Sequence, residues 1–181
     1  TFRTVLDARG FTDFEALNIA MGGSLASQWG SVASTSRVRN YLEEHPTIDM
    51  VFATLGGNDL MYGQPEDWFD NNGSPEEEDE FFTGVAENIA TFAKAVTDVR
   101  PNLRVVICGY DYMNAIKKFG NNCDTTPEAA ADMADQINEG VMRFERKVAD
   151  RLKTMERVRF VNNYGLMQWA FGYPGTEIPT W

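Results

Sequence analysis

The residues of this chain best suited to catalysis form the run Leu55-Gly56-Gly57-Asn58-Asp59, which directly follows an apolar segment. The two glycines allow the backbone to turn sharply and to approach a ligand closely. The Asn58 amide can donate hydrogen bonds to the oxyanion that develops during acyl transfer. The same run also suits a plain glycine turn, in which Asn58 and Asp59 hydrogen-bond their own loop. The run alone leaves both interpretations open.

A second glycine turn lies upstream, in Asn18-Ile19-Ala20-Met21-Gly22-Gly23-Ser24. It precedes an expected helix, so its free backbone N–H groups can serve an anion. Two such turns, separated by one helix, suit adjacent parts of one site. Taken alone, this segment is a weak signal, and an ordinary glycine turn explains it better.

Together these residues resemble the SGNH (GDSL-type) ester hydrolases, whose four sequence blocks carry Ser, Gly, Asn and His. Gly23, five residues after Asn18, takes the place of the block II glycine, and Gly56 to Asp59 match the Asn block. The stretch Glu44-His45-Pro46, which leads through a strand into that block, also has the look of the family. The resemblance covers residues 1 to about 65.

The resemblance implies a flavodoxin-like, three-layer α/β/α fold with a parallel sheet. It also implies hydrolysis of a small-molecule carboxylic ester through a serine acyl-enzyme, with Gly23 and Asn58 as catalytic residues in the oxyanion hole. No metal and no organic cofactor is implied. Lipid esters, acetylated sugars, thioesters and small aryl esters all remain open as substrates. A secreted bacterial enzyme is one option for its compartment.

Two blocks of the family are missing from the chain. No Gly-Asp-Ser occurs, and no His follows His45. His45 precedes a strand, so we expect it at the sheet edge opposite the site. Ser24, in the elbow-like Gly22-Gly23-Ser24-Leu25-Ala26, is followed by no histidine except His45, which is expected at the opposite edge, so Ser24 is expected to be a helix N-cap.

We therefore expect residues 1–181 to be a single SGNH-like domain that is truncated at both ends, with the nucleophile and the histidine outside this sequence. The chain begins at Thr1 rather than Met, which agrees with that interpretation. A non-catalytic ligand-binding or interaction domain on the same fold is the alternative. If the domain is truncated, its partners include the missing part of that domain besides the small-molecule ester substrate.

Aromatic residues in the loops after the strands are candidates for walling a substrate pocket, although core packing would explain any single one. They are Tyr62, Trp68, Phe69, Tyr110, Tyr112, Tyr164 and Trp169. The residues that we expect to contact substrate are Asp59, Tyr62, Tyr110 and Tyr112.

The elements that must position these residues alternate between strands and helices, which is typical of a parallel sheet covered by helices. Strands are predicted at 14–20, 48–54, 103–108 and 158–161. Helices are predicted at 27–44, 75–99 and 126–153, and the end of another at 4–8, which Gly10 terminates. A long loop is expected over 60–75. By the resemblance, a strand outside the sequence separates strands 14–20 and 48–54.

Composition excludes several classes of partner. The formal net charge of −11 argues against binding nucleic acid or an anionic lipid surface. Cys108 and Cys123 are too few for a disulfide framework, and whether they form one bridge is open. No apolar run approaches the roughly 20 residues of a membrane span. The acid run Glu76 to Glu80 suits the start of a helix better than a cation site.

Overall fold

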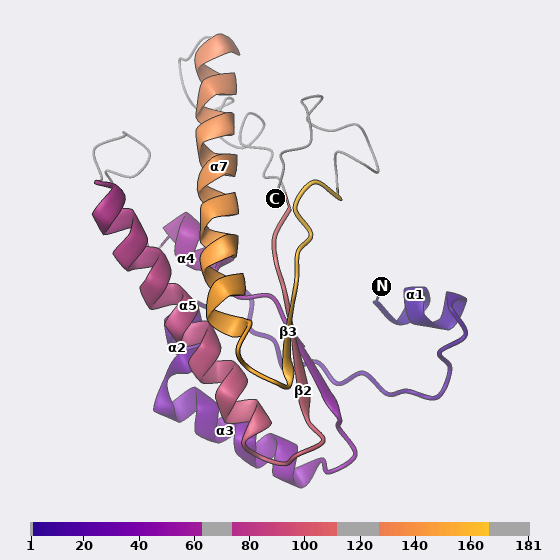
Figure 1. The fold of residues 1–181 in the computed structure, drawn as a ribbon. Coiled ribbons are helices and arrows are strands. Elements are labelled where there is room, and N and C mark those ends of the chain that lie inside the picture. Colours follow the sequence, from indigo (N-terminus) through magenta and orange to yellow (C-terminus); the bar gives the residue numbers. More distant parts are fainter. Residues whose placement is uncertain (1, 63–73, 112–126, 167–181) are drawn as a thin grey trace.

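The computed structural model describes residues 2–62, 74–111 and 127–166 (Figure 1). The elements alternate along the chain as expected. In order they are α1 (Phe2–Ala8), α2 (Ala26–Gly30), α3 (Val32–Glu44), β1 (Met50–Ala53), α4 (Gly57–Tyr62), α5 (Pro75–Thr97), β2 (Arg104–Cys108), α7 (Pro127–Leu152) and β3 (Val158–Val161).

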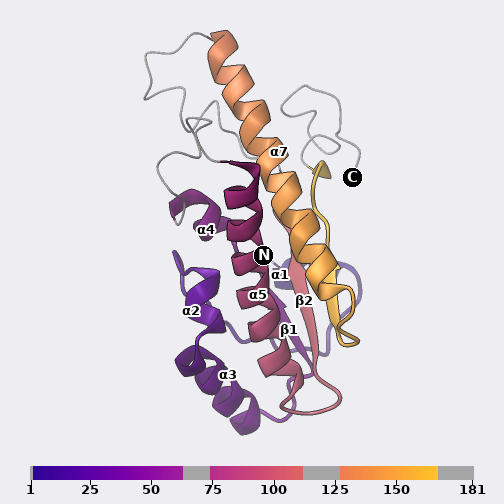
Figure 2. The same ribbon diagram turned by 60° about the vertical axis from the view of Figure 1, so that its left-hand side comes forward.

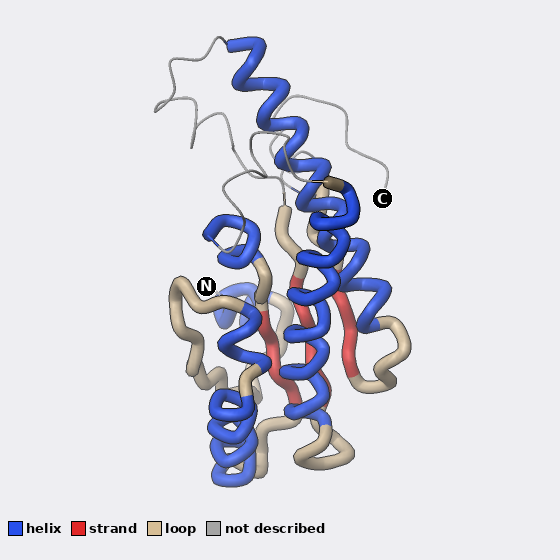
Figure 3. The backbone as a smooth tube through the Cα atoms, turned by 90° about the vertical axis from the view of Figure 1, so that its left-hand side faces the viewer, coloured by secondary structure: helices blue, strands red, loops and turns tan. Residues whose placement is uncertain are grey.

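The three strands form one parallel sheet in the order β1-β2-β3, with Phe52 beside Val106 and Ile107 beside Phe160. Helix α5 connects β1 to β2, and α7 follows between β2 and β3. Connections of the same hand that advance in one direction across a sheet place their helices on one face. Figures 1 and 3 show α5 and α7 on the same face, and α2 and α3 extend that layer (Figure 2). The prediction of an α/β fold with a parallel sheet is confirmed.

The core lies between this face of the sheet and the helices. Val105 and Ile107 of β2 are almost fully buried, as are Ile89 of α5 and Phe144 and Val148 of α7. Three ion pairs link the outer edges of the two long helices: Glu78–Arg143, Asp79–Lys147 and Glu87–Arg151. Apolar burial beneath and charge pairing above therefore fix the α5–α7 pair.

The opposite face of the sheet is open. Side chains alternate between the two faces of a strand, and on this face Met50, Phe52 and Val161 are 38%, 49% and 41% exposed. The strand predicted at 48–54 is present as β1, and its side chains pack against the core on one face only. Among the described elements only one face carries a packed helical layer, so the three-layer arrangement is not seen there.

Helix ends follow their local sequence. Ser74 caps α5 in a capping box with Glu77, and Pro75 occupies the first turn. Gly10, with φ +80°, ends α1, because Phe11 N–H bonds back to Leu6 O in the manner of a Schellman motif. The predicted helices at 75–99 and 126–153 and the strands at 103–108 and 158–161 are confirmed to within two residues.

The strand predicted at 14–20 is wrong. Residues 12–20 have no regular secondary structure, and Leu17 and Ile19 are 43% and 41% exposed. Alternating apolar residues become a strand only if a neighbouring strand takes up their backbone hydrogen bonds. In the described ranges no strand pairs with β1 on its outer side. The prediction that an outside strand separates strands 14–20 and 48–54 therefore has no strand at 14–20 to which it applies.

The helix predicted at 27–44 is two helices, because Ser31 ends α2 and caps α3. A Cβ at Gly30 would lie 2.9–3.1 Å from Asn88 of α5, so any other residue there would force α2 or Asn88 to shift. The Ser31 hydroxyl accepts from Ser34 N–H and starts α3 in a new direction.

The loop predicted at 60–75 begins late, because α4 runs to Tyr62. Residues 63–73 of that loop lie outside the described ranges.

No helix in the described ranges is both long and apolar enough to cross a bilayer.

Candidate active site

The turn after β1 presents Asn58 in the first turn of α4. Gly56 has φ +103°, a backbone conformation that favours glycine, and a Cβ there would collide with the Phe144 ring. Asn58 Nδ2 donates a 3.0 Å hydrogen bond to Ser24 O. The fold thus brings the two glycine turns, 34 residues apart in sequence, into direct contact.

Gly23 lies one residue before that contact. Its φ is +77°, and the space where a Cβ would project is open to 4 Å. Within the described ranges, no hydrogen bond engages Gly23 N–H. This exposed donor next to the Asn58–Ser24 contact is available to an anion. The two residues predicted to form the oxyanion hole therefore lie on adjoining turns.

Ser24 is held by its own surroundings. Its hydroxyl donates to Met21 O and accepts from Trp29 Nε1, both at 2.7 Å. The N-cap of α2 is Leu25, so the prediction that Ser24 is a helix N-cap is wrong. The hydroxyl instead ties the glycine turn to the Trp29 indole, an arrangement that suits a structural serine better than a nucleophile.

Asp59 is predicted to contact substrate, but the residue is only 5% exposed. Asp59 Oδ2 accepts a 2.8 Å hydrogen bond from Ala26 N–H, at the start of α2. Burial raises the pKa of this carboxyl, although the Ala26 N–H acts in the opposite direction. In this structure Asp59, the residue after Asn58, joins α4 to α2 through its hydrogen bond with Ala26.

Tyr110 follows β2 and packs its ring against Gly57, where a Cβ would collide with it. Burial is the first cause of the raised pKa of its phenol, and the backbone N–H of Gly57 interacts with the phenol oxygen and lowers that pKa. Tyr110 thus lies against the turn that carries Asn58. Tyr62 is the last residue of α4 and its side chain lies outside the description, as does all of Tyr112.

Glu145 is a site neighbour that the sequence interpretation missed. It is 1% exposed, and its Oε1 accepts a hydrogen bond from Tyr110 N–H. Burial, followed by the charge of Asp111, raises the pKa of this carboxyl to about 7. A signal was present in the sequence, because Glu145 lies at helical spacing on the apolar stripe of Val141 and Val148.

The turn after β3 supports the turn after β2. Asn163 Nδ2 donates to Gly109 O, and Gly165 N–H donates to Asp111 Oδ1, both at 2.8 Å. The Tyr164 hydroxyl donates to Asn138 O at 2.7 Å. Tyr164, one of the aromatics proposed to wall a pocket, therefore anchors its loop to α7.

His45 lies at the C-cap of α3, before β1, and its ring packs on Tyr41 with the centroids 4.4 Å apart. It is thus at the amino end of the sheet, away from Asn58, as predicted. Cys108 is a free cysteine, and Cys123 lies outside the described residues.

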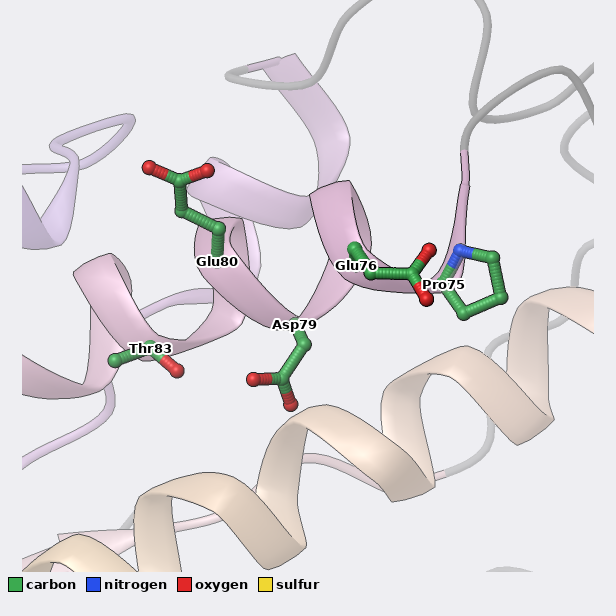
Figure 4. A pocket seen from close by; sticks show the side chains of 5 residues that line it. All are labelled: Pro75, Glu76, Asp79, Glu80 and Thr83. Carbon is green, nitrogen blue, oxygen red and sulfur yellow. The ribbon is translucent and has the colours of Figure 1, made fainter.

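The acid run at the start of α5 borders a surface hollow (Figure 4), lined by Pro75, Glu76, Asp79, Glu80 and Thr83. Asp79 points toward α7, where it pairs with Lys147, whereas Glu80 points away. The hollow is thus part of a charged helix surface and is separate from the glycine turns. Nowhere in the described ranges do three or more His, Cys, Asp or Glu side chains gather as a metal would require.

No family model matches this chain, and no curated protein matches it in sequence.

Proposed function

We propose that this chain carries the oxyanion-stabilising part of a serine ester hydrolase of the SGNH type. The observation that supports the proposal best is the hydrogen bond from Asn58 Nδ2 to Ser24 O. It joins the two turns that bear the residues expected to stabilise the oxyanion. The carboxyl ends of parallel strands, where Asn58 lies, are also where open α/β sheets bind ligands.

In the proposed reaction a serine hydroxyl attacks the ester carbonyl, while a histidine accepts the serine proton. The carbonyl oxygen gains negative charge as the tetrahedral intermediate forms. Gly23 N–H and the second Nδ2 hydrogen of Asn58 would donate to that oxygen. Removal of one such donor costs roughly 2.7–4 kcal/mol of transition-state stabilisation. The alcohol then leaves with the proton, and water hydrolyses the acyl-enzyme.

Neither the nucleophile nor the base is assigned to these 181 residues. The hydroxyl of Ser24 is engaged by Met21 and Trp29, and His45 is at the other end of β1. Under this proposal both groups come from polypeptide beyond the sequence, and the domain is completed by it. The flavodoxin-like sheet with a further strand beside β1 belongs to the same proposal.

The experiment compares Asn58→Ala with wild type in the complete enzyme. We expect kcat for p-nitrophenyl acetate to fall by about 10²–10³ with little change in KM, because the lost interaction forms mainly in the transition state. Asn40→Ala, which removes an exposed amide on α3 away from the glycine turns, is the matched control. An unchanged kcat in Asn58→Ala would remove that residue from the oxyanion hole.

The 181-residue chain alone should hydrolyse p-nitrophenyl acetate no faster than background, since it has no usable base histidine. Turnover that survives His45→Ala and disappears in Ser24→Ala would contradict this expectation and would assign the nucleophile to the elbow-like turn.

A non-catalytic binding domain is the second candidate. It is favoured by the way in which Asp59 and Ser24 direct their polar atoms to the fold itself. An inactive complete protein that still binds an ester or its acid product at the glycine turns would support this alternative.

A further inference from the structure

Glu145 occupies a position where an aliphatic residue would be expected. It lies on the inward face of α7 between Phe144 and Val148, and no Lys or Arg in the described ranges pairs with it. One carboxyl oxygen accepts from Tyr110 N–H, and the other, also buried, has no partner there. Burying such an acid costs free energy. Its bond to Tyr110 is therefore the contact to which a role can be assigned.

This hydrogen bond is the first in a short relay of contacts, which runs from Glu145 through Tyr110 and Gly57 to Asn58. Tyr110 is fixed through its N–H by Glu145, and its ring packs against Gly57. Gly57 immediately precedes Asn58, whose amide reaches Ser24 O. A displacement of Tyr110 would therefore remove the support behind the turn that carries Asn58.

The rest of the β2 turn is fixed from the side of the sheet. Gly109 N–H donates to Val161 O, and Asn163 Nδ2 donates to Gly109 O. Neither bond reaches Tyr110 itself. Among the described residues, the hydrogen bond that Tyr110 N–H donates to Glu145 is the one that fixes the backbone of Tyr110 from the side of α7.

Among the described residues, the charged groups that act electrostatically on this contact are acidic. The charge of Asp111, the residue after Tyr110, raises the pKa of Glu145. The charges of Asp59 of α4 and of Glu145 itself raise the pKa of the Tyr110 phenol. A charged Glu145 is therefore disfavoured, and a neutral carboxyl, which still accepts from Tyr110 N–H, fits the surroundings better.

We propose that Glu145 is a positioning residue of the oxyanion site, which holds Asn58 in place through Tyr110 and Gly57. Its consequence for catalysis rests on the ester hydrolysis proposed above, whereas the relay of contacts does not.

The relay is tested on the 181-residue chain by NMR of Glu145→Leu, Glu145→Gln and the control Glu139→Gln, which changes an exposed acid earlier on α7. In Glu145→Leu we expect the Tyr110 amide to exchange about tenfold faster and the Asn58 side-chain amide signals to shift. Glu145→Gln should keep both near wild type, because its amide oxygen accepts the same bond. Unchanged Tyr110 and Asn58 signals in Glu145→Leu, or equal changes in Glu139→Gln, would overturn the proposal.

A second measurement remains decisive if Glu145→Leu fails to fold. In wild type the Tyr110 amide shift should follow the ionisation of Glu145, with a midpoint near the pKa of about 7. The same titration should be absent in Glu145→Gln. A Tyr110 amide that titrates identically in both proteins would overturn the proposal.

In the complete enzyme Glu145→Leu should lower kcat about tenfold or more, because small displacements of catalytic groups are costly, with KM within about twofold. Glu145→Gln should retain most of the activity. If Asn58→Ala has no effect on kcat while the NMR changes occur as expected, the proposed function fails and the relay stands. If Asn58→Ala is impaired and Glu145→Leu is fully active, the positioning role fails instead.

Discussion

At the scale of single residues, the chain places a carboxylic acid where water cannot reach it. Glu145 has a pKa of about 7 in the folded protein, against 4.5 for the unperturbed group, because burial disfavours its charged form. The folded state therefore binds a proton more tightly than the unfolded state. The contribution of this tighter proton binding to the free energy of unfolding is complete below pH 4.5 and is lost as the pH rises through 7.

We expect the free energy of unfolding of wild type to fall by about 3 kcal/mol more than that of Glu145→Gln between about pH 4.5 and pH 8. The glutamine side chain of that variant would keep the hydrogen bond to Tyr110 but has no proton to lose. Urea unfolding at a series of pH values measures the difference. Parallel stability–pH curves for the two proteins would show that Glu145 is not held neutral by the fold.

The sequence was sufficient to predict that the glycine turns carrying Asn58 and Gly23 lie beside each other, as the hydrogen bond from Asn58 to Ser24 O shows. It was not sufficient to predict the packing of Asp59 and Tyr110, which lie against α2 and Gly57. Whether a polar side chain faces inward or outward depends on elements distant in sequence. Glu145 was missed for the same reason, since its partner is 35 residues away.

At the scale of elements, the sequence predicted a helix end correctly where the contacts that form this end lie within the helix itself. The cap Ser74, with Pro75 and the acids after it, predicted the start of α5 correctly because those contacts lie within one helical turn. The break at Ser31 was not foreseen, since it depends on the approach of Gly30 to Asn88. The segment 14–20 failed because a strand needs a partner that alternation alone does not supply.

Ser74→Ala should lower the free energy of unfolding by about 1 kcal/mol, because Glu77 N–H loses its side-chain acceptor and the reciprocal contact loosens. Ser36→Ala, which changes an exposed serine inside α3, is the matched control and should be neutral or slightly stabilising. Thermal and urea unfolding measure both. A Ser74→Ala protein as stable as wild type would mean that α5 is held by packing alone.

At the scale of the whole molecule, the helices α2, α3, α5 and α7 lie on one face of the sheet, and the opposite face keeps apolar side chains in contact with water. Parallel sheets are normally covered on both faces. We expect the chain alone to bind the dye 8-anilinonaphthalene-1-sulfonate with a clear rise in fluorescence under native conditions. Met50→Lys with Val161→Lys should lower that rise by about half or more.

The matched control is Val32→Lys, which changes an apolar residue that is 83% exposed on α3, on the helical side. It should leave the fluorescence close to wild type. A wild-type chain that binds no dye while fully folded would show that the face is already covered in solution.

The open face has a thermodynamic consequence for every stability measured on this chain. Anything that binds the folded chain there, and not the unfolded chain, raises the free energy of unfolding by RT ln(1 + [L]/Kd). A polypeptide that covers this face only in the folded chain would act in this direction, whereas a detergent that also binds the unfolded chain would not. The melting temperature of the isolated chain should therefore rise with the concentration of any ligand that is specific for the folded face.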